Sequence, residues 1–166
     1  MTRKIALVGA LALAMSLTAS LGLARNASGD KSTGGIAFVN ANQNVVEVSF
    51  NAHETPDPNA DAPAKGRVDV RDHEFGGTFV DFRGDVDCYN NTGDDSATFT
   101  GQITEFDGPI ADPNRMFFRV SVEDNGTPGW RGPDRITVNR SAAPFNCMDD
   151  HDAVRDVVRG NLVVHH

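Results

Sequence analysis

Phe117–Val138 reads FFRVSVEDNGTPGWRGPDRITV, and this stretch decides the fold class. In its first part Phe118, Val120 and Val122 alternate with polar or bulky neighbours, the pattern of a strand with one buried and one wet face. The DNGTPG segment that follows is rich in Gly, Pro, Asn and Asp, which favour turns. Ile136 and Val138 then resume the alternation. The stretch therefore predicts two antiparallel strands joined by a tight connection.

The same period-two alternation recurs along the chain. Its runs are 46–52, 68–70, 80–88, 97–103 and 162–164, with a short apolar run at 35–39. The segments between them carry turn residues, at 55–63, 72–77, 90–95 and 107–114. We therefore expect an all-β fold of about eight antiparallel strands. Because the order is mostly hairpin-like, a meander closing into a barrel is favoured over a β-sandwich.

Two local expectations follow from these patterns. Within the run 80–88, strict alternation predicts that Phe82, Val86 and Cys88 lie on one face of the strand. Between Cys147 and Gly160, apolar residues at helical spacing, with an acidic residue as cap, indicate one or two helical turns at most.

The N-terminal segment has the features of an export signal. Arg3 and Lys4 precede an apolar or small run, and no further charge occurs before Arg25. We predict a cleavable signal peptide over 1–24, with a cut after Ala24 and a cut near Ser20 as the alternative. Its apolar run is too short and too rich in small residues for a membrane span. Residues 25–34 are expected to form a flexible lead-in, and 35–166 a single β-domain in a secreted or cell-envelope protein.

The charge balance limits the partners. The whole chain has a net charge of −8, and removal of 1–24 leaves 13 Lys and Arg against 23 Asp and Glu. An acidic domain is repelled by nucleic acid and by anionic membrane surfaces, so neither is expected as a partner. High solubility is the simplest role of this charge.

Cys88 and Cys147 are the chain's two cysteines. In an oxidising compartment such a pair usually forms a disulfide, which we predict here. A catalytic cysteine would need a nearby histidine, and His151 is only a sequence neighbour of Cys147.

Three loop residues are candidates for a weak Ca²⁺ site. Asp124, Asn125 and Asp134 flank the connection in the opening stretch, and carboxylate and amide oxygens are the ligands that Ca²⁺ takes. EF-hand spacing is absent. The favoured interpretation is a rigid connection in which Asp124 and Asp134 accept hydrogen bonds from backbone amides across the loop.

Other acidic and histidine residues form weaker patterns. Asp85 and Asp87, with Asp81, lie on one face of a strand, and paired carboxylates serve glycosidases. Arg83 interrupts this row, so a solvated face is favoured. The acidic residues of 149–152, together with His165 and His166, are a candidate divalent-metal group, for which a structural role is again favoured.

Several segments together resemble a known family. They are VSFNAH (Val48–His53), GRVDVRD (Gly66–Asp72), the strand ending in Cys88, the VEDNGTPG and PDRITV loop, Cys147, and GNLVVH (Gly160–His165). The pattern is similar to that of a family of small secreted bacterial β-domains of unknown function. The resemblance implies a fold and an extracellular setting, and it brings no catalytic residues with it.

Three functions remain open from the sequence. The leading one is a secreted, non-catalytic β-domain with an interaction or structural role, whose partner is an unidentified extracellular protein, glycan or small molecule. We expect no cofactor apart from the weak Ca²⁺ candidate, and no enzymatic activity. A carrier of small apolar ligands is the first alternative, because an eight-stranded barrel can enclose a cavity. Gly84, Ala97 and Gly101 would leave either space or tight packing inside it. A hydrolase using Asp85 and Asp87 is the second alternative.

Overall fold

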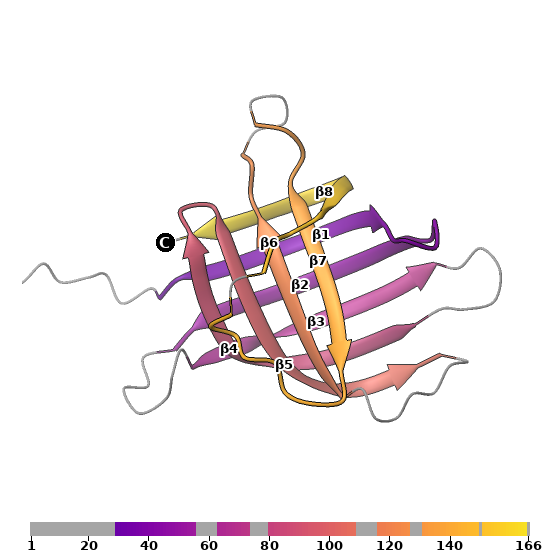
Figure 1. Ribbon diagram of the computed structural model, residues 1–166, viewed down its shortest axis with the longest axis horizontal. Coiled ribbons are helices and arrows are strands. Elements are labelled where there is room, and N and C mark those ends of the chain that lie inside the picture. The colour runs from indigo at the N-terminus through magenta and orange to yellow at the C-terminus, as the bar shows by residue number, and fades with distance from the viewer. Residues whose placement is uncertain are drawn as a thin grey trace, which may run out of the picture.

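The chain forms a closed, eight-stranded antiparallel β-barrel. The computed structural model describes residues 29–55, 63–73, 80–108, 116–126, 131–149 and 151–165. Each strand pairs with the next in sequence, and β8 pairs with β1 to close the barrel (Figure 1). The predicted all-β meander barrel is confirmed. The strands are β1 (Lys31–Val39), β2 (Val45–Glu54), β3 (Ala64–His73), β4 (Asp81–Gly93), β5 (Ser96–Asp107), β6 (Phe117–Glu123), β7 (Arg135–Ser141) and β8 (Arg155–His165).

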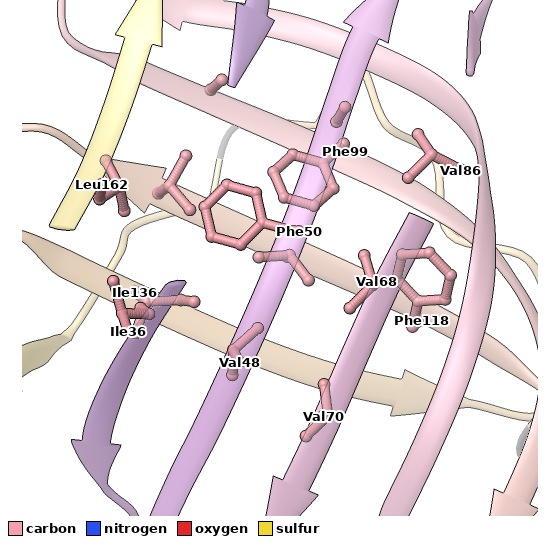
Figure 2. Packing of buried hydrophobic residues seen from close by; sticks show 14 of the residues in the cluster. Ile36, Val48, Phe50, Val68, Val70, Val86, Phe99, Phe118, Ile136 and Leu162 are labelled. Atoms are coloured by element: carbon pink, nitrogen blue, oxygen red, sulfur yellow. The ribbon is translucent and has the colours of Figure 1, made fainter. Parts of the chain in front are cut away.

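Apolar side chains from all eight strands meet inside the barrel (Figure 2). Phe99 is fully buried, and its ring centroid lies 5.2 Å from that of Phe50 and 6.4 Å from that of Tyr89. Phe118 is also fully buried and packs beside Phe82, with 6.1 Å between ring centroids. Inward positions are apolar because each fully buried side chain of this size stabilises the fold by about 1.5–3 kcal/mol.

The space beside the inward-facing glycines Gly84 and Gly101 is filled by the aromatic ring of Phe118. A β-carbon placed on Gly84 would lie 2.4 Å from the Phe118 ring, and one on Gly101 would lie 2.7 Å from the same ring. Both distances are shorter than any tolerable carbon–carbon contact, so a side chain at either position would displace Phe118. These glycines therefore mark tight packing against a large neighbour.

Two local predictions from the sequence differ from the structure. The expected flexible lead-in over 25–34 overlaps β1, which already begins at Lys31 and pairs with both β2 and β8 from that residue on. The helical turns expected before Gly160 are replaced by strand, since β8 runs from Arg155 to His165. The β-branched residues Val157 and Val158 favour strand over helix, and pairing with β1 decides the outcome.

A β-bulge moves Cys88 to the face opposite to the predicted one. The register between β4 and β5 shifts between Val86 and Cys88. As a result Tyr89, the next residue, points into the core and is 2% exposed, while Cys88 faces outward. Strict alternation could not show this, because a bulge inserts one residue and reverses every facing after it.

The joint between β7 and β8 is the weakest in the barrel. These strands pair only at Arg135 with Asp156 and at Ile136 with Arg155, whereas β1 and β2 pair along the whole of β1. Between them lies a long connection, 142–154, which crosses in front of β5 and β4 before it returns to the start of β8 (Figure 1). We call this connection the strap.

Within the described part of the chain, no helix is long and apolar enough to cross a membrane. The predicted signal peptide, 1–24, lies outside the described residues, as do Trp130, Asp150 and His166.

Candidate functional site

The outside of the barrel is divided into two faces by the strap. On the strap side the outward residues Thr98, Thr100 and Ser121 are buried. On the other side of the barrel most outward side chains of β1–β4, and Glu105 of β5, are at least partly open to solvent. We call the open part the outer polar face. Its residues are Gly35, Glu47, Ser49, Asn51, Arg67, Asp69, Arg71, Arg83, Asp85, Glu105 and Arg159.

Two cysteines fix the strap to the barrel. Cys88 of β4 and Cys147 of the strap form a disulfide with a Cα–Cα distance of 6.1 Å, which confirms the predicted bond. It closes a sequence separation of 59 residues, and the loop-entropy model gives about 4 kcal/mol of stabilisation for a loop of this length. The Arg119 guanidinium carbon lies 4.7 Å from the centre of the Phe145 ring on the strap, and burial lowers the pKa of this arginine.

A row of hydroxyl groups lies beneath the strap. Thr98, Ser121 and Thr137 are in register across β5, β6 and β7. The hydroxyl groups of Thr98 and Ser121 are buried and lie 3.1 Å apart. Thr137 Oγ1 donates to the Asp152 carbonyl and accepts from the Val154 amide, at 3.1 and 2.9 Å. The strap is thus a packed layer joined to the barrel by specific bonds.

Opposite charges face each other across the strands of the outer polar face. Asp69 accepts hydrogen bonds from Arg71 at 3.1 Å and from Arg83 at 2.6 Å, and Arg83 also donates to Glu105 at 3.0 Å. These bonds and charges, first those of Asp69, raise the pKa of Arg83. Because these ion pairs are exposed and screened by solvent, their main effect is to favour one strand register.

Three adjoining hollows cross this face, and Asp69 lines all of them. The one over β8, β1, β2 and β3 has a volume of about 410 Å³. Gly35 and Ser49 form part of its floor, and Arg159, which donates a hydrogen bond to Glu47, stands at its rim. The hollow is shallow, polar at its edge and open to solvent.

Gly35 is a glycine that the fold itself does not require. A β-carbon on Gly35 would meet no atom within 4 Å. By contrast, a β-carbon on Gly160, where φ is +106°, would lie 2.1 Å from the Gly35 carbonyl oxygen. A glycine inside a strand weakens it, and a common reason for one is the close approach of another molecule.

The predicted Ca²⁺ candidates instead anchor β8. Asp134 accepts hydrogen bonds from the backbone amides of Asn125, at 3.0 Å, and Leu162. Asp124 accepts from the amides of Gly126 and Val164, at 2.8 and 3.1 Å. Burial, with a smaller contribution from the charge of Asp124, raises the pKa of Asp134. This is the hydrogen-bonded loop favoured from the sequence, and Ca²⁺ binding there stays a prediction.

The paired acidic residues of β4 lie on the outer surface. Asp85 is 3.6 Å from Arg67, and its side chain is 60% exposed. Asp87 accepts a hydrogen bond from Thr100 at 3.3 Å. Neither residue lines the three hollows of the outer polar face. The arrangement offers two solvated carboxylates with separate partners and no shared cleft.

The acidic end of the strap does not form a metal centre with the described residues. His151 and Asp152 line a polar hollow together with Asp95 and Glu123, and Asp95 is paired with Arg131 at 2.5 Å. His165 lies at the end of β8. Among the residues that the structure describes, no group of three or more His, Cys, Asp or Glu side chains is arranged to hold a metal ion.

Sequence reasoning missed the outer polar face and the strap. Both depend on which residues lie opposite each other on neighbouring strands, and one-dimensional alternation does not fix that register. The turn-forming residues predicted where strands would end, whereas the length of each strand pairing is seen only in the structure. Comparison of the chain with protein-family models, curated proteins and solved structures found no match.

Proposed function

We propose that the chain is a secreted, non-catalytic β-domain that binds a partner outside the cell or in the cell envelope through its outer polar face. The observation that carries the proposal is the filled interior. Phe99 and Phe118 are fully buried at its centre, and the Phe118 ring fills the space beside Gly84 and Gly101. With the inside of the barrel used for packing, the outer surface is the part left for recognition.

Two further features support this proposal. The disulfide suits an oxidising compartment, as expected for an exported chain. Gly35 leaves the floor of a hollow open although the barrel would accept a side chain there. The packed interior does not favour the carrier alternative. Asp85 and Asp87 have separate partners, which does not favour the hydrolase alternative.

The test is to fill the hollow without altering the barrel. In Gly35→Tyr the new side chain extends into open space, and Ala142→Tyr adds the same ring at an exposed strap position as a matched control. Both variants, after a check of equal melting temperatures, are mixed with cell-envelope material and culture supernatant of the producing organism.

We expect the wild type and Ala142→Tyr to be retained on one of these fractions and Gly35→Tyr to be lost from it. Equal retention of all three proteins would rule out recognition through this hollow. Absence of wild-type retention on both fractions would contradict the binding role itself.

A further inference from the structure

One edge of the outer polar face carries a line of basic side chains. His165 of β8 lies opposite Lys31 of β1, Lys31 lies opposite His53 of β2, and His53 lies opposite Lys65 of β3. All four side chains are exposed. Because neighbouring strands are about 4.8 Å apart, the four follow one another across the sheet at that interval. We call these residues the basic line.

The acidic residue on the outward face of β2, Glu47, pairs with Arg159 and not with the basic line. Asp30 and Glu54 are the chain neighbours of Lys31 and His53, and Asp30 accepts a hydrogen bond from Asn91 at 3.0 Å. Besides burial, the charges of Asp30 and Glu54 also contribute to the raised pKa of Tyr89, whose ring lies inside the barrel. Within the described residues, no ion pair or side-chain hydrogen bond involves any member of the basic line.

The arginines of the same face behave differently. Arg67 pairs with Asp85, Arg83 with Asp69, and Arg159 with Glu47. The unpaired lysines are therefore an exception on a surface where charges are otherwise matched. Lys31 and Lys65 are also the chain's only lysines beyond Lys4. Lys31 and Lys65 lie two strands apart with His53 between them, so no acidic side chain stands between the two ammonium groups along the line.

We infer that the basic line binds the anionic groups of a saccharide, that is, a sugar chain carrying sulfate, phosphate or carboxylate. The backbones of the two lysines, two strands apart, are about 10 Å from each other, and both flexible side chains can reach anionic groups on one short sugar chain. Thr33 and Asn51, the next outward residues on β1 and β2, are exposed and offer a hydroxyl and an amide to sugar hydroxyls.

The net negative charge of the whole chain disfavours the binding of long polyanions. At a net charge of −8, a nucleic acid extending beyond the basic line meets repulsion from the rest of the surface. Asp87, two residues beyond the Asp85 that pairs with Arg67, places a negative charge on β4, the strand next to Lys65 of β3. A short anionic oligosaccharide fits the local positive site without meeting that repulsion. The inference rests on the proposed binding role and names the ligand class.

The test uses defined oligosaccharides and single charge removals. Binding of a sulfated heparin tetrasaccharide, an oligogalacturonate and neutral maltotetraose is measured by titration calorimetry at low and at physiological ionic strength. The variants are Lys31→Gln and Lys65→Gln. Arg155→Gln is the matched control, because Arg155 is an exposed cation outside the basic line with no ion-pair partner among the described residues.

We expect an anionic oligosaccharide to bind and the neutral one not to bind. Each lysine variant should bind about two- to fivefold more weakly, the size of one exposed charge contact, while Arg155→Gln binds like the wild type. Added salt should weaken wild-type binding. Equal weakening by Arg155→Gln, or no wild-type binding of either anionic oligosaccharide, would overturn the inference.

Two further measurements distinguish saccharide binding by the basic line from nucleic-acid binding and from partner binding at the Gly35 hollow. A single-stranded oligonucleotide of the same charge that binds as tightly as the oligosaccharide would overturn the assignment to saccharides. Lysine variants that are still retained like the wild type on the envelope or supernatant fraction, while Gly35→Tyr is lost, would overturn this inference and leave the proposed function standing.

Discussion

Inside the barrel, the Tyr89 ring is stacked on Phe99, and its hydroxyl lies 2.9 Å from Ser32 Oγ. Both residues are almost fully buried. Burial, with smaller contributions from the charges of Asp30 and Glu54, raises the pKa of Tyr89 to about 12. A phenol in this position is stable as long as it remains neutral and hydrogen-bonded, since a buried phenolate would lack solvation.

Replacement of Tyr89 by Phe should lower the free energy of unfolding at pH 8 by about 1 kcal/mol, because the Ser32 hydroxyl loses its buried partner. The pH dependence has a defined sign. The pKa of Tyr89 is higher in the folded state than its ordinary value of 10.0, so its contribution is complete below pH 10 and is lost as the pH rises towards 12. Urea unfolding at pH 8, 10 and 11.5 measures both effects.

Ser32→Ala with intact Tyr89 is the control for this experiment, since it removes the same hydrogen bond and keeps the titrating group. The fall in stability above pH 10 should persist in Ser32→Ala and be smaller in Tyr89→Phe. A wild type and a Tyr89→Phe variant with identical pH profiles from 8 to 11.5 would contradict the assigned role.

At the level of the strand, β8 is held on its two sides by different groups. Towards β1 it forms a regular ladder from Ala37 to Lys31, with a register shift between Ala37 and Phe38. On the other side, beside the chain that precedes the start of β7 at Arg135, the amides of Leu162 and Val164 donate to the carboxylates of Asp134 and Asp124. Side-chain oxygens thus replace the carbonyls of a missing strand, and the barrel stays closed beyond the short β7–β8 pairing.

Asp134→Ala should lower the free energy of unfolding at pH 7 by about 2 kcal/mol, because two backbone amides lose a charged acceptor. Asp134→Asn keeps one carbonyl-type acceptor and should cost less. Since the pKa of Asp134 is raised in the folded state, ionisation opposes folding, and Asp134→Asn should gain relative to the wild type as the pH rises from 3 to 7. Chemical denaturation over this range measures the difference.

The same pair of variants decides between an anchor and a Ca²⁺ site. For an anchor, the melting temperature of the wild type is the same with excess Ca²⁺ and with chelator, and the variants shift both values equally. A wild type stabilised by Ca²⁺, with the effect lost in Asp134→Asn, would instead establish the metal site, because a ligand bound only by the folded state raises its stability.

Strand positions were predictable from the sequence wherever the alternation was regular. Val46–Ala52, Ala97–Ile103 and Phe117–Val122 lie within β2, β5 and β6 as expected. The predictions failed where a tertiary contact overrides the local pattern. The bulge before Cys88 reverses the facing of the strand, and pairing with β1 extends β8 over residues with helical spacing. The basic line was invisible because it depends on the register of four strands.

For the molecule as a whole, the filled interior and the acidic surface have separate roles. The core residues of the barrel supply stability, and the disulfide adds to it by linking the strap to β4. A net charge of −8 favours solubility and confines favourable contact with anions to local sites such as the basic line. Recognition on the outside can therefore change by surface substitution without altering the packing within.

The filled barrel makes a testable prediction about apolar ligands. Phe99 is fully buried between Phe50 and Tyr89, so Phe99→Ala should lower the free energy of unfolding by about 3–5 kcal/mol and leave an apolar cavity. An apolar cavity of this kind binds small aromatic molecules, and such binding raises stability. Benzene should therefore raise the melting temperature of Phe99→Ala and leave that of the wild type unchanged. A wild type stabilised by benzene as strongly as the variant would mean that the native barrel already contains a binding cavity, and the carrier function would then replace the one proposed here.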